Sequence, residues 1–255
     1  MLETANPIWS AIESGDVDEV YALIKENNGI DYIALPFDAS GRMFKGHFNV
    51  RCDQPDGPYK YTNFRPLMSA SFHGHDDIVQ MLIEHGADVN AVTDNNMTAL
   101  HIAVEARQVQ VVHTLLSKGA KPSAAMTCGT TPLHLTVLDG GVTTDVTLEH
   151  HIMELMECEI ACNLVLKLAD QNARDKWHET ALEKAMRLEN WTMMDLLSSL
   201  HTSTKAIIRA TIEHVRFTWT GYLIQMSKDN PEYEFDETNA HMLDVMVHGH
   251  DSADG

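Results

Sequence analysis

Cysteine is scarce in this 255-residue sequence, which contains only four cysteines. Four are too few for a disulfide framework in a chain of this length, and this favours a reducing compartment. Cys158 and Cys162 are four residues apart, but no second pair of cysteines or histidines accompanies them. We therefore expect buried thiols rather than half of a zinc site.

Positive charge is also in short supply. The 18 lysines and arginines face 37 aspartates and glutamates, which gives a formal net charge of -19. Such a surface repels phosphates, so neither nucleic acids nor anionic membranes are expected partners. It favours a protein partner with a basic surface, although solubility alone would also account for the acidity.

Long apolar runs are missing as well. No segment approaches 18 uninterrupted apolar residues, and the first residues lack a basic patch followed by an apolar core. We therefore expect a soluble, cytoplasmic protein. The content of 44% hydrophobic and 22% charged residues is typical of a folded globular chain, long enough to bury a sizeable core.

Local catalytic motifs are absent. The sequence contains no G-x-S-x-G elbow, H-E-x-x-H pair, P-loop or G-x-G-x-x-G turn. We therefore expect no catalytic site, no cofactor and no metal site. An enzyme whose site is assembled in space from the insertions and the C-terminal segment remains the alternative.

What the sequence does contain is a repeated phrase. FRPLMSA, MTALHIA, TTPLHLT and ETALEKA begin at residues 64, 97, 130 and 179, so their spacings are 33, 33 and 49 residues. An earlier copy, NPIWSAI, places Pro7 in the slot of Pro66, 59 residues upstream. Both longer spacings exceed 33, which indicates that two repeats carry insertions.

A second half follows each phrase, as in HGHDDIVQMLIEHGADVNA from His73. The period of 33 with T-P-L-H-x-A, a G-H-like turn and G-A-D-x-N-A resembles the ankyrin repeat. The match is close over about residues 62–124 and looser over 1–30 and 125–200. The resemblance implies an all-α solenoid of four to six stacked helix-turn-helix units with protruding turns.

The residues of each unit suit helices. Thr98 and Thr131 can cap helix starts, and Pro66 and Pro132 suit a first helical turn. We expect the leucines that follow to point into the stack, and glycines to end the second helices in the left-handed conformation. These residues are Leu67, Leu100, Leu133, Gly86 and Gly119.

His101 raises the question of catalysis because it lies in an apolar stretch. It shares its slot with His134, but Met68 and Glu183 occupy the same slot in other copies. In ankyrin families this histidine bonds to the backbone between neighbouring repeats. The resemblance therefore implies a structural histidine rather than a base or a metal ligand.

Three parts are expected along the chain. These are an ankyrin-repeat domain over 1–200 with insertions at about 31–60 and 140–156, a C-terminal capping helical segment over 201–229, and an acidic, partly disordered tail over 230–255. The first insertion either projects as a functional finger or covers the first unit as a flap. Trp219 and Tyr222 either belong to the cap or dock a partner.

Partner binding in ankyrin proteins uses the turn tips and first helices on a concave face, so the resemblance implies a protein-protein interaction module. We expect a monomer that acts as an inhibitor, protector or effector. Exposed aromatic side chains on such a face suit binding hot spots. Placement against the repeat predicts these partner-binding residues: Tyr61, Phe64, Phe72, His73, Asp94, Asn95, Met97, Glu105, Thr130, Leu138, Asp139, Lys176, Trp177, Glu179 and Arg187, with Phe44 and Phe48 in the finger.

Asn90, in the stretch LIEHGADVNA, has two interpretations. It resembles the asparagine that a cytosolic oxygenase hydroxylates in eukaryotic ankyrin repeats. Alternatively, it is a turn residue that ties neighbouring loops together.

Overall fold

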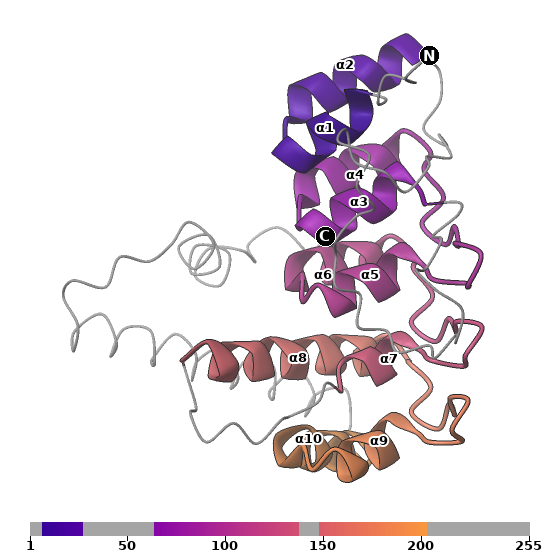
Figure 1. Cartoon of the computed structure of the whole chain (residues 1–255), viewed down its shortest axis with the longest axis vertical. Coiled ribbons are helices and arrows are strands. Elements are labelled where there is room, and N and C mark those ends of the chain that lie inside the picture. Colours follow the sequence, from indigo (N-terminus) through magenta and orange to yellow (C-terminus); the bar gives the residue numbers. More distant parts are fainter. Residues whose placement is uncertain (1–6, 28–63, 138–147, 203–255) are drawn as a thin grey trace, which may run out of the picture.

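The computed structural model describes residues 7–27, 64–137 and 148–202. Within these ranges the chain forms helix pairs stacked in chain order, which confirms the predicted all-α solenoid (Figure 1). We number the pairs as units 1 to 5. They are α1 (Pro7–Ser14) with α2 (Val17–Asn27), α3 (Pro66–His73) with α4 (Asp76–Glu84), α5 (Ala99–Glu105) with α6 (Val109–Ser117), α7 (Pro132–Leu135) with α8 (Leu148–Leu166), and α9 (Ala181–Arg187) with α10 (Trp191–Thr202).

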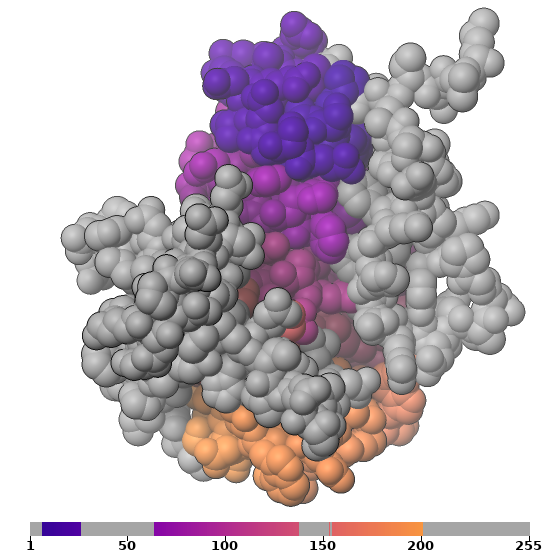
Figure 2. All heavy atoms as spheres, turned by 60° about the vertical axis from the view of Figure 1, so that its left-hand side comes forward, coloured from indigo at the N-terminus to yellow at the C-terminus, as the bar shows by residue number. Residues whose placement is uncertain are grey.

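The helices form two layers. The first helices α1, α3, α5, α7 and α9 contact one another in order, and the second helices do the same. One continuous core runs between the layers, and Figure 2 shows the units in contact from the indigo end to the orange end. The largest fully buried side chains are Ile12, Met68, Ile78, Leu82, Met97, Leu100, Ile102, Leu115, Leu133, Ile160, Leu164 and Met193.

The predicted helix starts are confirmed. Thr98 and Thr131 each form a capping box with the histidine three residues later, and Pro66 and Pro132 occupy the first turns of α3 and α7. Proline is well placed there because its missing N–H would have no partner within the helix. The three predicted leucines are buried.

The second helices of units 2 and 3 end as predicted, at Gly86 with φ +100° and Gly119 with φ +94°. Leu168 occupies the same position after α8, with φ +67° and a side chain that is 73% exposed. A side chain in the left-handed conformation costs about 1–2 kcal/mol. The fold therefore imposes this backbone conformation even where glycine is absent.

Unit 4 departs from the pattern of the others. Helix α7 has four residues, and α8 has 19 where α4 and α6 have nine each. Figure 1 shows that α8 projects beyond its neighbours on the side opposite the turns. An ion pair of 2.9 Å between Arg107 Nε and the buried Glu157 carboxylate joins α8 to unit 3.

The predicted domain boundaries remain a prediction. The insertion at 31–60 and the tail at 230–255 lie outside the described residues, as does nearly all of the predicted cap.

Candidate functional site

Three β-turns project between the units on one side of the stack, at the right of Figure 1. They span residues 93–97, 126–130 and 175–179, and in each the first backbone N–H donates to the last carbonyl, at 2.9 to 3.0 Å. We call these three segments the turn row. Their positions are 33 and 49 residues apart, the spacings of the repeated phrase.

Backbone hydrogen bonds join the turns to one another. The N–H of Thr127 donates to the Asn95 carbonyl at 3.0 Å, and the N–H of Lys176 donates to the Cys128 carbonyl at 2.8 Å. At Gly129, with φ +75°, a Cβ atom would come within 2.9 Å of backbone atoms of Arg174 and Asp175. The turns therefore form one closely packed row whose tips have little freedom to move independently.

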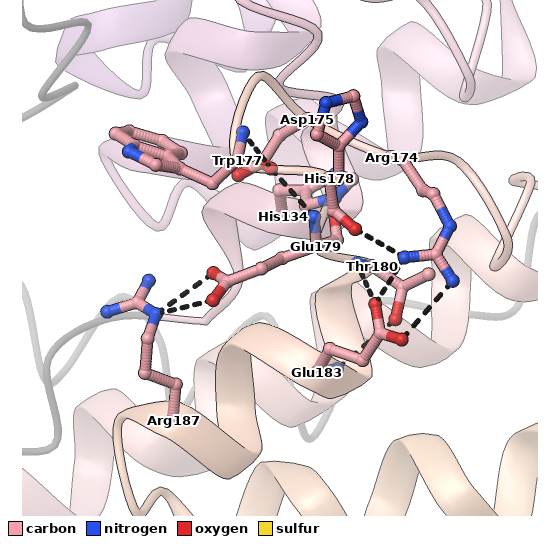
Figure 3. Close-up of polar contacts among 9 residues, drawn as sticks. All are labelled: His134, Arg174, Asp175, Trp177, His178, Glu179, Thr180, Glu183 and Arg187. Carbon is pink, nitrogen blue, oxygen red and sulfur yellow. Dashed lines mark hydrogen bonds and ion pairs between the residues drawn. The ribbon is translucent and has the colours of Figure 1, made fainter.

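The last turn is held by a buried carboxylate (Figure 3). One oxygen of Asp175 accepts hydrogen bonds from the backbone N–H groups of Trp177 at 2.9 Å and Glu179 at 3.1 Å. Trp177 itself is 46% exposed, and the ammonium group of Lys176 lies 4.3 Å from the centre of its ring. The turn therefore presents a large aromatic side chain from a fixed backbone.

Thr93 has the corresponding role in the first turn, where its hydroxyl accepts from the N–H of Met97 at 3.1 Å. Neither Thr93 nor Asp175 was among the predicted site residues. Both residues stand at the first position of a turn, two repeat spacings apart, but the side chain at that position differs between the turns, so the repeat carries no signal for its role.

Two ion pairs flank the last turn (Figure 3). Arg187 Nε donates to both carboxylate oxygens of Glu179, at 2.8 and 2.9 Å, and Arg174 pairs with Glu183 at 2.8 and 3.2 Å. The backbone N–H of Thr180, and after it Arg174, lower the pKa of Glu183. Because these pairs are largely exposed, they fix side-chain positions more than they stabilise the fold.

His101 and His134 are structural, as predicted. Nδ1 of each ring accepts from the backbone N–H of its own threonine, Thr98 at 3.2 Å and Thr131 at 3.3 Å. The proton of His134 therefore lies on Nε2, which donates to the Glu179 carbonyl of the next unit at 3.0 Å.

Burial determines the charge state of these rings. It lowers the pKa of His101 to about 4, against a smaller opposing effect of the Thr130 and Ala124 carbonyls. Burial also lowers the pKa of His134. His101 is therefore neutral at pH 7 and belongs to the packing between units.

The predicted site residues separate by exposure. Phe64, Met97 and Thr130 are buried, so their side chains are not presented to a partner. Asp94, Lys176, Trp177 and Arg187 are exposed, and Phe72, His73, Asn95, Glu105 and Glu179 are half-buried. Tyr61, Leu138, Asp139, Phe44 and Phe48 lie outside the described residues.

Aromatic stacking surrounds the half-buried His73 at the corner of α3. Its ring lies edge-on to Phe72, with the centroids 5.1 Å apart, and stacks on His75 at 5.9 Å. Burial first, and then the charge of His75, lower the pKa of His73. The end of α3 is therefore a packed aromatic cluster.

Asn90 ties two units together. Its side-chain amide donates to the Gly119 carbonyl at 3.1 Å and accepts from the N–H of Lys121 at 2.9 Å. These bonds support the interpretation of Asn90 as a turn residue that connects neighbouring loops.

Reactive groups are few in the part of the chain that the structure describes. No cluster of three or more histidine, cysteine, aspartate or glutamate side chains there could hold a metal ion. Cys128, Cys158 and Cys162 are buried, and burial, followed by the charge of Glu159, raises the pKa of Cys162 to about 12. None of the described helices is long and apolar enough to span a membrane.

Stacked helix pairs, a buried Thr-x-x-His capping box and a row of linked turns define a helical-repeat solenoid. The chain belongs to the ankyrin-repeat proteins, since the family model for ankyrin repeats matches residues 2–126 in three copies.

Three proteins illustrate the similarity. A fowlpox virus (strain NVSL) ankyrin repeat protein is 30% identical over 158 residues, covering 52% of this chain and 46% of the viral protein. The transient receptor potential cation channel subfamily A member 1 of Drosophila melanogaster is 30% identical over 187 residues, 66% of this chain and 14% of the channel. The mouse 2-5A-dependent ribonuclease is 49% identical over 55 residues, 21% of this chain and 8% of the ribonuclease. The chain thus spans less than half the length of each of these relatives.

Proposed function

We propose that this chain is a protein-protein interaction module that binds a protein partner along the turn row and the neighbouring first helices. Ankyrin repeats are generally protein-binding modules. The observation that carries the proposal is the backbone bonding of three turns into one row, with Trp177 exposed in the last of them. A surface that is already ordered loses little entropy on binding, and tryptophan is enriched among binding hot spots.

Acidic side chains on and beside the turn row favour a partner that presents lysine or arginine. Asp94 is exposed in the first turn, and Glu105 is half-buried on α5 beside the row, whereas Glu179 of the last turn is already paired with Arg187. The net charge of -19 adds a long-range attraction for basic surfaces, which is screened by salt. We therefore propose a partner with a basic surface whose capture weakens as the salt concentration rises.

The finer role that fits this arrangement is that of an inhibitor, protector or effector. Phe44 and Phe48 of the predicted finger would supply a second contact with the same partner. In this proposal the module is a cytoplasmic monomer, and it acts by occupying a surface of its target rather than by catalysis.

A quantitative pull-down from a native lysate tests the role of the turn row. Wild type is compared with Trp177→Ala and with the matched control Trp191→Ala, which removes a 67% exposed tryptophan at the start of α10, outside the turn row. We expect Trp177→Ala to lose partner capture by about tenfold or more, as for a hot-spot residue, and Trp191→Ala to retain it.

The pull-down is repeated at low and moderate salt, and far-UV circular dichroism verifies that each variant is folded. Capture by wild type should fall at the higher salt. Equal capture by the three folded proteins would exclude the turn row as the binding surface.

A further inference from the structure

The outer face of α9 differs from the equivalent face of α5. The two helices repeat the same phrase, so Leu182 and Met186 correspond to Leu100 and Val104. Leu100 and Val104 are 0% and 2% exposed, whereas Leu182 is half-buried and Met186 is 58% exposed. Helix α5 contacts α7 of the next unit, but no described helix lies beyond α9 at the lower end of Figure 1.

Helix α10 extends this face. Its Met194 corresponds to Val112 of α6, which is fully buried in the middle of the stack, and Met194 is only half-buried. The orange unit 5 forms the end of the described stack in Figure 2. Apolar side chains of α9 and α10 therefore lie where a further layer would cover them in an inner unit.

The chain continues directly from α10 with a segment that suits this face. Six apolar residues in 203–226 recur at spacings of four, three, four, three and four residues, which is typical of one face of a helix, while Ile207, Phe217 and Ile224 fall on the other side. The six residues are Ile208, Ile212, Val215, Trp219, Tyr222 and Met226.

The segment is also long enough. As a helix, the 24 residues of 203–226 would span about 36 Å, and the 12 residues of α10 span about 18 Å. The segment can therefore reverse direction after Thr202 and still cross both helices of unit 5, even if several residues form the turn.

We propose that residues 203–226 fold back as a helical cap on the outer face of α9 and α10, with the apolar stripe against Leu182, Met186 and Met194. The cap replaces the sixth unit that the repeat pattern would otherwise require. This proposal does not rest on partner binding, since the cap would lie on the outer face of unit 5 and not on the turn row.

Site-specific photo-crosslinking in the full-length chain tests the cap. A photoreactive benzoylphenylalanine replaces Met186, and a control protein carries it at Met153 on α8, another methionine that is 40% exposed. After irradiation and proteolysis, we expect position 186 to yield crosslinks within one chain to peptides from 203–226. Position 153 should not yield them.

Two variants in the segment make the test specific. Ile212→Asp places a charge in the apolar stripe, whereas Ala210→Asp places the same charge about 160° away on the helix, near its opposite side. We expect Ile212→Asp to lower the crosslink yield from position 186 by about tenfold, because burying the new carboxylate opposes docking. Ala210→Asp should leave the yield within about twofold of the parent protein.

Two results would overturn the cap. Crosslinks from position 186 that join only separate copies would assign the face to a second copy of the chain. The absence of any product with 203–226, in a chain that circular dichroism shows to be folded, would leave the face open.

Discussion

Units 3 and 5 share the phrase T-A-L at the start of their first helices but differ in the next residue. In unit 3 this residue is His101, which is fully buried, and in unit 5 it is Glu183, which is exposed. Both side chains complete a capping box with the threonine before them. Local structure therefore accepts either residue, and the presence of a following unit determines which one suits the position.

The second helices of units 3 and 4 differ in how they end. Gly119 follows the second helix of unit 3, whereas Leu168 stands at the same position in unit 4 with φ +67°. Elsewhere units 3 and 5 match, since Asn96 and Arg107 have φ angles of 60° and 56° and their equivalents His178 and Glu189 have 61° and 53°. The end of unit 4 consequently stores backbone strain at a position where unit 3 has glycine.

The largest expected effect comes from exchanging the residues in the histidine slot. His101→Glu would bury a carboxylate between units 3 and 4, and we expect it to lower the free energy of unfolding by about 3–5 kcal/mol. The reciprocal variant, Glu183→His, should be much closer to wild type because that position is exposed. Urea denaturation followed by circular dichroism measures both. Similar losses for the two variants would contradict the distinction between inner and end units.

The second prediction concerns pH. The folded pKa of His101, about 4, lies below its unfolded value of 6.5, so the unfolded chain takes up the proton first as the pH falls. The contribution of His101 to the free energy of unfolding is fully present above pH 6.5 and decreases by about 3 kcal/mol between pH 6.5 and 4. Chemical denaturation at a series of pH values measures the slope of the free energy of unfolding against pH.

His101→Gln retains an N3 side chain that can complete the capping box but does not titrate, so it should reduce the slope. The control His178→Asn alters an exposed histidine and should leave the slope as in wild type. If His101→Gln keeps the full wild-type slope, other groups cause the pH dependence.

The third prediction separates backbone strain from close packing. Gly129→Ala combines a positive φ with a Cβ that would overlap the backbone of the last turn, and we expect a loss of about 2–3 kcal/mol. Gly119→Ala is the matched control, since its φ is also positive but no atom lies within 4 Å of the added Cβ. We expect it to cost about 1 kcal/mol, measured by urea denaturation. Equal losses would show that the turns can move apart.

The smallest expected effect is a gain. Leu168→Gly should relieve the strained backbone after α8 and stabilise the protein by about 0.5–1 kcal/mol, after the extra entropy of glycine in the unfolded chain is subtracted. Lys167→Gly introduces the same residue one position earlier, where φ is not positive, and should be destabilising. A loss of thermal stability in Leu168→Gly would mean that the exposed leucine makes contacts that outweigh the strain.

The sequence predicted the fold better than it predicted the surface. The repeat period, the capping residues and the glycines predicted the helix pairs, because each of these signals depends on only a few neighbouring residues. Thr98, Pro132 and Gly86 are examples. Burial at the turns depends on the adjacent units, so Phe64 and Met97 could not be distinguished from exposed residues by their position in the repeat.

The function of Asp175 was also hidden from the sequence. Nothing in the repeated phrase distinguishes its carboxylate from the exposed acidic residues around it, and only the three-dimensional arrangement shows that it binds the N–H groups of its own turn. Trp177 was correctly placed at a turn tip, and its exposure agrees with a contact role, which stays a proposal.

The most direct test of the account is to locate the partner on the stack by photo-crosslinking in a native lysate. Benzoylphenylalanine is placed at Thr127, an exposed residue in the middle of the turn row, or at Thr192, an exposed threonine on α10. The account predicts a crosslinked partner from position 127 and none from position 192. A partner captured only from position 192, or equally from both, would contradict binding along the turn row.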